Sequence, residues 1–309
     1  MPFGEAAVGK SKAMLLGLPE FELVFADTVE GACSLLSRYG AHAQVFAGGT
    51  DLFVKMKQRR TVPRRLINIK RIPNLDQIRY DGRDGLRIGA LTTIQAIEAS
   101  AVIAEKFPAL KQAAGILGTA QIRNLGTLGG NLANASPAAE FAPPLLTLGA
   151  SLRCMGRGGE RLVPLEEFFV SPGKTVLKED EIITEVHVPN LPARAEGTYL
   201  KYSLRKMDVA IACAAVLVCF DGDLCRDVRI ALGAVGPTPF RARKAEATLR
   251  GERLAGDPGE SELLEEAARV ASDESFPIDD FRGNARHRRR LVGMLVRKGL
   301  ERVTARARA

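Results

Sequence analysis

The sequence predicts an α+β protein with a mixed N-terminal region and a smaller C-terminal domain of strands and helices. Short strand-like and helix-like segments, separated by Gly and Pro, follow one another over roughly the first 195 residues. A polar stretch with two prolines, 189–197, marks a boundary there. Beyond it come long apolar strand-like segments and then helical patterns. We therefore expect one domain over 18–195 and a second over 196–309.

The first elements of the N-terminal domain are short. Segment 20–40 begins as a strand and continues as a helix that starts at Asp27 or Thr28 and ends at a glycine. Segment 43–57 contains a short strand, a glycine turn and then a helical or extended piece. In segment 65–72 apolar and basic residues alternate, which predicts a half-buried strand.

The middle of this domain combines helices with strands. Segment 85–100 is predicted as a strand followed by a helix that starts at Thr92 or Thr93. Segment 107–118 is predicted as a helix with Pro108 in its first turn, where a missing N–H costs little. Strands and turns are expected in the remaining segments, 142–156, 160–169 and 181–189.

The C-terminal domain has the clearest periodicity. Long strands are predicted in 198–220 and 227–242, and helices in 244–251, 261–272 and 284–303. We expect the last helix to be amphipathic. Its inward face would carry Leu291, Met294, Leu295 and Val296, and its outward face Arg288, Arg289 and Lys298.

The net charge of +8 is concentrated in two places. Residues 52–75 hold eight Lys and Arg without an acid, and residues 281–309 hold nine Arg and Lys298 against Glu301 alone. A nucleic-acid-binding module is one interpretation. A solvated face or the surface for an acidic partner subunit is favoured, because no aromatic residues interleave with the charges for stacking on bases. Nucleic acid is therefore not an expected partner.

The sequence contains no indication of a secreted, membrane-spanning or metal-binding protein. The first twenty residues show no signal-peptide pattern, and no eighteen apolar residues run together, so we expect a cytoplasmic protein without a membrane span. Five scattered cysteines without a CxxC and three distant histidines predict neither a disulfide framework nor a metal site. No set of residues predicts a catalytic nucleophile or general base.

Two glycine-containing segments stand out, "FAGGTDLF" from position 46 and "LGTLGGNLANASP" from position 125. A Gly pair permits positive φ and lets backbone N–H groups converge on one point, where they bind anionic oxygens. Each segment alone is a weak signal, and a strand-to-helix turn also explains the first. Together they suit a ligand with two adjacent phosphates. Neither matches the Rossmann or P-loop pattern.

These segments, with "IGALTTI" and "LKYSLRKMDVAIACAA", resemble the FAD-binding subunits of molybdenum hydroxylases, including carbon monoxide and xanthine dehydrogenases. The resemblance covers roughly residues 20–300. It implies an FAD-binding domain of the vanillyl-alcohol oxidase (PCMH) type, with lobes of about 18–75 and 76–195. It also implies a C-terminal domain like that of the carbon monoxide dehydrogenase flavoprotein. An extra iron–sulfur cluster is not expected, because no Cys lies between 34 and 153.

The resemblance also implies site residues. The first segment would hold the FAD pyrophosphate by its backbone, through Ala47, Gly48, Gly49, Thr50, Asp51 and Leu52. The second would hold it from the other side, through Thr127, Gly129, Gly130 and Asn131. Glu140, in place of the commoner Asp, would reach the ribose, and Ile183 would pack near the adenine. Lys201 is either a basic residue close to the flavin ring or an ordinary exposed strand lysine.

The implied function is electron relay within a complex. A large molybdopterin-binding subunit would oxidise the substrate, and a small subunit would carry two [2Fe–2S] clusters. This chain would pass their electrons through FAD to NAD, a quinone or another external acceptor, and the expected assembly is a dimer of heterotrimers. A free-standing flavoprotein oxidase is the alternative enzyme, disfavoured by the small C-terminal region and by the absence of a His beside either glycine segment.

Overall fold

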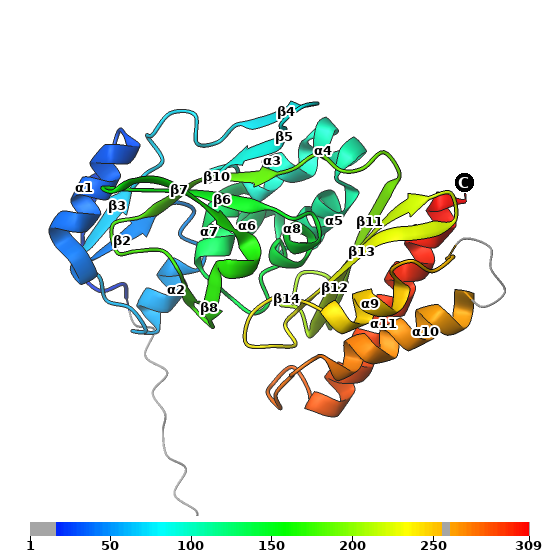
Figure 1. Ribbon diagram of the computed structural model, residues 1–309. Helices are drawn as coiled ribbons and strands as arrows, with labels where there is room; N and C mark the ends of the chain where they lie inside the picture. Colours follow the sequence, from blue (N-terminus) through cyan, green and yellow to red (C-terminus); the bar gives the residue numbers. More distant parts are fainter. Residues whose placement is uncertain (1–16, 255–259, 309) are drawn as a thin grey trace, which may run out of the picture.

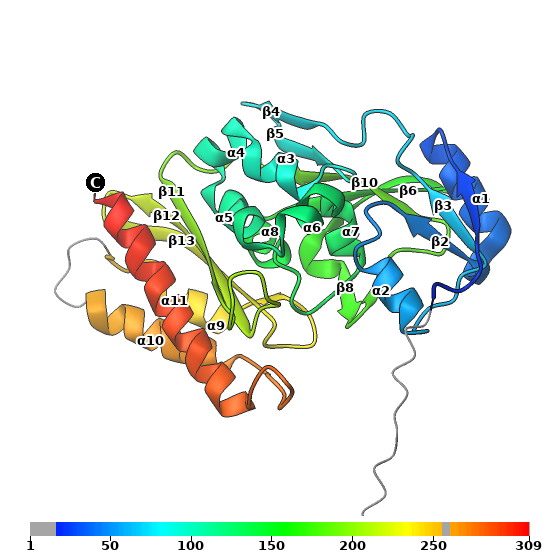
Figure 2. The ribbon, with the colours of Figure 1, turned by 180° about the vertical axis from the view of Figure 1, so that it is seen from behind.

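The computed structural model describes residues 17–254 and 260–308. Residues 1–16, over which no signal peptide is predicted, lie outside the described residues, as do 255–259 and 309. The predicted α+β class is confirmed. The elements follow one another along an elongated molecule, with the first strands at one end and the last helices at the other (Figure 1). The view from behind gives the same order (Figure 2).

The first sheet is parallel, with β3 between β1 and β2. Its elements are β1 (Glu22–Phe25), α1 (Val29–Tyr39), β2 (Ala43–Phe46), α2 (Leu52–Lys57) and β3 (Arg65–Asn68). Thr28 is the N-cap of α1, because its hydroxyl accepts a bond from the N–H of Gly31. The half-buried strand predicted for 65–72 is the central strand instead. Both faces of β3 are covered, and Leu66, Ile67 and Asn68 are all buried.

The second sheet is antiparallel, in the order β4-β5-β10-β6-β7. Its strands are β4 (Ile78–Asp81), β5 (Gly85–Gly89), β6 (Ser151–Gly156), β7 (Gly159–Pro164) and β10 (Ile182–Val188). Between β5 and β6 come α3 (Ile94–Ala99), α4 (Ala101–Lys106), α5 (Pro108–Ile116), α6 (Ala120–Leu125), α7 (Leu128–Ala133) and α8 (Ala142–Thr147). Thr93 is the N-cap of α3. A small sheet pairs β8 (Phe169–Ser171) with β9 (Lys174–Thr175).

Two parts of this region differ from the prediction. Segment 142–156 was expected to contain only strands and turns, yet its first six residues form α8. Pro143 and Pro144 lie in the first turn of that helix, where a proline loses no hydrogen bond. The second glycine segment was expected to be a turn, and it is the start of helix α7.

The third sheet is antiparallel, in the order β11-β12-β13-β14. It consists of β11 (Ala195–Tyr202), β12 (Ala212–Asp221), β13 (Leu224–Gly233) and β14 (Phe240–Arg241). The helices α9 (Arg243–Leu249), α10 (Glu260–Asp273) and α11 (Ala285–Ala307) cover one face (Figure 2). The helices α5 and α8 of the N-terminal region pack on the same sheet. The long strand predicted for 198–220 is therefore two strands joined by the loop 203–211.

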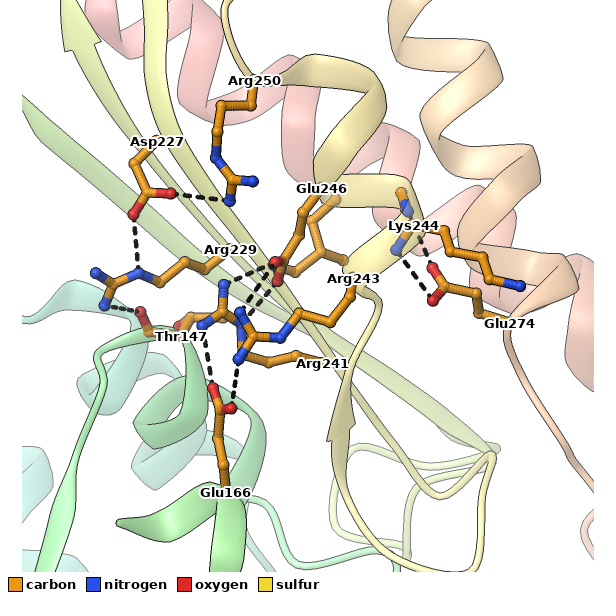
Figure 3. A network of polar contacts seen from close by, with 12 residues as sticks. Thr147, Glu166, Asp227, Arg229, Arg241, Arg243, Lys244, Glu246, Arg250 and Glu274 are labelled. Atoms are coloured by element: carbon orange, nitrogen blue, oxygen red, sulfur yellow. Dashed lines mark hydrogen bonds and ion pairs between the residues drawn. The ribbon is translucent and has the colours of Figure 1, made fainter.

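A polar network joins the N-terminal region to this sheet (Figure 3). Glu166, which follows β7, forms ion pairs with Arg241, at 3.0 Å, and with Arg243. Arg241 also pairs with the buried Glu246 at 2.7 Å. On the other side, Arg229 donates to the carbonyl of Thr147, at the end of α8. Because these groups come from both parts of the chain, they fix the sheet against the N-terminal region. The predicted domain boundary at 195 stays a prediction.

All five cysteines are free and buried. Burial raises the pKa of the Cys33 and Cys154 thiols to about 11, and that of the Cys213 and Cys225 thiols to about 12. Cys213 and Cys225 belong to the strands of the third sheet. The thiols therefore fill space in the core as small apolar groups.

Helix α11 differs from its prediction at two residues. Arg288, predicted to face outward, is 1% exposed, and it donates to the carbonyls of Ile211, Ile278 and Ala234. Met294, predicted to face inward, is 47% exposed. The buried stripe follows steps of four through 291, 295, 299 and 303, and 294 lies beside it. Arg288 is buried because three carbonyls and Asp280 surround its guanidinium.

We expect Arg288→Met to destabilise the protein strongly, by about 3–5 kcal/mol, because three buried carbonyls lose their donor. Arg289 is the next residue, and its side chain is exposed. The free energy of unfolding of Arg289→Met should stay within about 0.5 kcal/mol of the wild-type value. Urea-induced unfolding followed by circular dichroism measures both. Equal unfolding midpoints for the two variants would contradict this account.

Candidate functional site

A cavity of about 1030 Å³ lies where the first and second sheets meet. Its size is at the upper end of the range of about 300–1000 Å³ for small-molecule sites. Twelve of the thirteen predicted site residues line it: Ala47, Gly48, Gly49, Thr50, Asp51, Leu52, Thr127, Gly129, Gly130, Asn131, Glu140 and Ile183. Lys201 does not line the cavity; it contacts Glu140 from behind the wall.

The first glycine segment connects β2 to α2. Gly49 has a φ of 74°, in the left-handed region that favours glycine. Gly48 is required for a different reason, since a Cβ there would overlap the carbonyl oxygen of Leu125 and lie 2.9 Å from its carbonyl carbon. Within the described ranges, the backbone N–H groups of 48–51 donate no hydrogen bond to the chain. These donors remain available to an anionic ligand.

The second glycine segment works differently from the predicted nest. Thr127 caps α7, and its hydroxyl accepts from the N–H of Gly130 at 3.1 Å. The N–H of Gly129 donates to the carbonyl of Ala90 at 2.9 Å, and that of Asn131 to the carbonyl of Thr127. The N–H groups of Gly129, Gly130 and Asn131 are thus used within the chain. A Cβ on Gly129 would lie 2.7 Å from the Cβ of Ala90, so this glycine permits close packing on the β5–α3 connection.

Asn131 gives a separate indication of a ligand. Its side-chain oxygen is buried and has no partner among the described residues, although Asn131 lines the cavity. A buried polar atom without a partner is costly. A ligand with hydroxyl or N–H donors would satisfy this oxygen, while the free N–H groups of 48–51 would meet phosphate. Lys55 and Arg60, which sequence reasoning did not select, line the cavity and supply positive charge. The cavity therefore fits a dinucleotide such as FAD.

Burial changes the pKa of two acidic residues in the cavity wall. Burial raises the pKa of Glu140, and the Lys201 ammonium, 3.1 Å away, opposes this effect. Burial also raises the pKa of Asp51, against the influence of Lys55. The Lys201 side chain is 2% exposed. The interpretation of Lys201 as an ordinary exposed strand lysine is therefore wrong.

A second acidic residue, Glu181, precedes Ile183 in the cavity wall. Arg161 binds both of its carboxylate oxygens at 2.8 Å, and the N–H of Lys178 donates to it at 2.9 Å. The bonds from Arg161 lower the pKa of Glu181 despite its burial. This arrangement fixes segment 175–183, most of whose residues line the cavity.

Sequence reasoning also missed Met207 and Val209, which line the cavity from the C-terminal part of the chain. Both are more than half exposed. They lie in the loop 203–211, which was predicted as the interior of one long strand. The polar run "SLRKMD" inside that apolar stretch is the signal that could have predicted a loop.

Comparison with known proteins gives the class. Residues 19–191 match the model of the FAD binding domain in molybdopterin dehydrogenase, and residues 198–303 match that of the CO dehydrogenase flavoprotein C-terminal domain. The fold and cavity therefore define an FAD-binding oxidoreductase subunit.

Individual relatives agree with this class. The 6-hydroxypseudooxynicotine dehydrogenase complex subunit alpha of Paenarthrobacter nicotinovorans is 35% identical, over 94% of this chain and 96% of the relative. The carbon monoxide dehydrogenase medium chain of Afipia carboxidovorans is 32% identical, over 91% and 96%. A structure of carbon monoxide dehydrogenase from Hydrogenophaga pseudoflava contains a chain with 33% identity and a TM-score of 0.90, covering 94% of this chain and 99% of that one.

The chain belongs to the family of FAD-binding subunits of molybdenum hydroxylases, and its cofactor is FAD. The predicted fold, an FAD-binding domain followed by a carbon monoxide dehydrogenase flavoprotein-like domain, is confirmed. The assignment of single residues to parts of FAD stays a prediction. In the described part of the chain, no helix is long and apolar enough to cross a membrane.

We expect Gly48→Ala to lower the FAD content of the purified chain strongly, because the new methyl group would push the first glycine segment away from Leu125. Overpacking of this kind costs roughly 1–3 kcal/mol or more. The matched control is Gly82→Ala, where a Cβ meets nothing within 4 Å. Flavin absorbance per protein measures both. Full flavin content in Gly48→Ala would contradict this prediction, because it would show that the first glycine segment can move away from Leu125 without loss of FAD.

Glu181 should make stability pH-dependent. Its folded pKa lies below the ordinary value of 4.5, so its contribution is complete above that value and is lost as pH falls through the folded pKa. Glu181→Gln should therefore show a smaller loss of stability in acid than the wild type. Thermal unfolding as a function of pH tests this, with the exposed Glu105→Gln as control. Parallel curves for Glu181→Gln and the wild type would contradict it.

Proposed function

We propose that this chain is the electron-transfer subunit of a molybdenum-containing hydroxylase or dehydrogenase complex. It would receive electrons from the [2Fe–2S] clusters of a small subunit and deliver them to an external acceptor. The observation that carries the proposal is the cavity, in which two glycine segments and the buried Asn131 oxygen suit a dinucleotide. Bound FAD supplies chemistry that links one-electron donors to two-electron acceptors.

The chain's own residues would bind and orient the cofactor. The free N–H groups of 48–51 would donate to the pyrophosphate, and the side chains of Thr127 and Asn131 would complete its surroundings. The Glu140 carboxylate would accept from a ribose hydroxyl. Ile183, buried in the wall, would pack on the adenine side and exclude water.

Partners follow from the relatives, which are named as medium chains or as subunits of complexes. We propose a large molybdopterin-binding subunit and a small subunit with two [2Fe–2S] clusters, assembled as a dimer of heterotrimers in the cytoplasm. The acceptor would be NAD, a quinone or another oxidant. The large subunit would select the substrate, which agrees with the different substrates in the relatives' names.

Removing the cofactor from the purified complex should separate two reactions. Substrate should still bleach the iron–sulfur absorption bands, whereas reduction of the external acceptor should fall to background and return when FAD is added back. Rapid-scan absorbance after mixing with substrate measures both steps.

The isolated chain reconstituted with FAD serves as the control, and it should oxidise no organic substrate at a comparable rate. Rapid oxidation by the isolated chain would contradict the proposal and favour a free-standing flavoprotein oxidase.

A further inference from the structure

The buried ammonium group of Lys201 has three hydrogen-bond acceptors. It donates to the carbonyl of Ile116 at 2.9 Å, to the carbonyl of Asp208 at 3.0 Å and to the Glu140 carboxylate at 3.1 Å. An ammonium group has three N–H donors and no acceptor. All three donors are therefore used within the chain, and none remains for a ligand.

Each acceptor belongs to a different part of the cavity wall. Glu140 lines the cavity itself. Ile116 ends α5 and precedes Leu117 and Gly118, which both line the cavity. Asp208 lies between Met207 and Val209, which line it from the C-terminal part. These three segments are far apart in sequence, and the Lys201 ammonium brings them together.

We propose that Lys201 is a positioning residue that fixes three segments of the FAD cavity wall and acts on the flavin through them, without touching it. The inference deepens the proposed function, since it concerns the same cofactor site. It differs from the expectation that Lys201 lies beside the flavin ring. The reason is geometric: the side chain is 2% exposed, stands outside the cavity lining and has no free donor.

The position of Lys201 in the fold suits this role. It lies on β11 opposite Cys213 of β12, within a sheet that is held to the N-terminal region by other contacts. The loop 203–211 starts immediately after β11, and the N–H of Ile211 donates to the carbonyl of Tyr202 at 2.8 Å, which closes the loop. The bond from Lys201 to Asp208 then sets where Met207 and Val209 stand against the cavity.

The first test is FAD affinity of the full-length chain, measured by flavin fluorescence after removal and titration of FAD. Lys201→Met should weaken binding by about tenfold or more, because three wall segments lose their common donor. Lys206→Met is the matched control, since Lys206 is exposed on the same loop, and it should bind as the wild type does. Equal affinity in Lys201→Met and the wild type would overturn the proposal.

Three further variants separate positioning from direct contact. Lys201→Arg keeps the charge, but its planar guanidinium cannot serve the same three acceptors, so it should not restore affinity. The double variant Lys201→Met/Glu140→Gln leaves no unpaired buried charge and should fold even if Lys201→Met does not. The fold-loss of FAD affinity in this double variant should be clearly smaller than the fold-losses of Lys201→Met and Glu140→Gln multiplied together. If Lys201→Met does not fold, Lys201→Arg takes its place in this comparison. Full rescue by Arg, or multiplicative losses, would indicate a direct electrostatic contact and overturn the proposal.

The pH profile of FAD affinity supplies a readout that general destabilisation does not move. Asp51 and Lys201 are the charged groups that act on Glu140. Removing Lys201 removes the influence that favours the Glu140 carboxylate, so the midpoint at which acid weakens binding should move to higher pH. The pH midpoint of FAD binding should differ between Lys201→Met and Lys201→Arg. In Glu140→Gln this transition should be absent. An unchanged midpoint in Lys201→Met would contradict the proposal. Failure of the wild-type chain to bind FAD would instead contradict the proposed function.

Discussion

The structure depends on close backbone contacts made by two glycine segments that lie about eighty residues apart in the sequence. Gly48 lies against the carbonyl of Leu125, and Gly129 lies against Ala90. No side chain larger than hydrogen fits at either place, because each neighbour includes main-chain atoms that cannot rotate away. The contact brings the first sheet, the β5–α3 connection and α7 to one point. The cavity exists because these elements converge there, and its free N–H groups lie on residues 48–51, which connect β2 to α2.

The motifs of the site could be predicted from sequence, since glycine pairs are local signals and the resemblance to the family implied the other site residues. Twelve of the thirteen predicted site residues line one cavity. Their roles were harder to predict. The second glycine pair reads as a nest, but its N–H groups are taken by Ala90 and by the helix cap. A glycine can be required for a positive φ, for a free N–H donor or for close packing. Which of these applies depends on its neighbours in space, which a single sequence does not reveal.

The two errors that concern buried cations have one physical origin. Arg288 and Lys201 were both read as exposed or potentially exposed, because an isolated cation is expensive to bury. Each is buried because backbone carbonyls from segments distant in sequence surround it. These carbonyls belong to Ile211, Ile278 and Ala234 for Arg288, and to Ile116 and Asp208 for Lys201. Sequence periodicity counts apolar faces and contains no information about unpaired carbonyls. Helices with strong patterns, such as α5 and α10, were predicted correctly.

The five buried cysteines have a consequence for a subunit whose cofactor is FAD. Peroxide reacts with the thiolate form of cysteine and far more slowly with the thiol. Burial holds the pKa of Cys33 and Cys154 near 11 and that of Cys213 and Cys225 near 12, so at neutral pH these groups are thiols shielded from solvent. The packing that fills the core therefore also protects these cysteines chemically: an oxidant in solvent meets no exposed thiol among the described residues, and oxidation of these side chains requires the protein to open first.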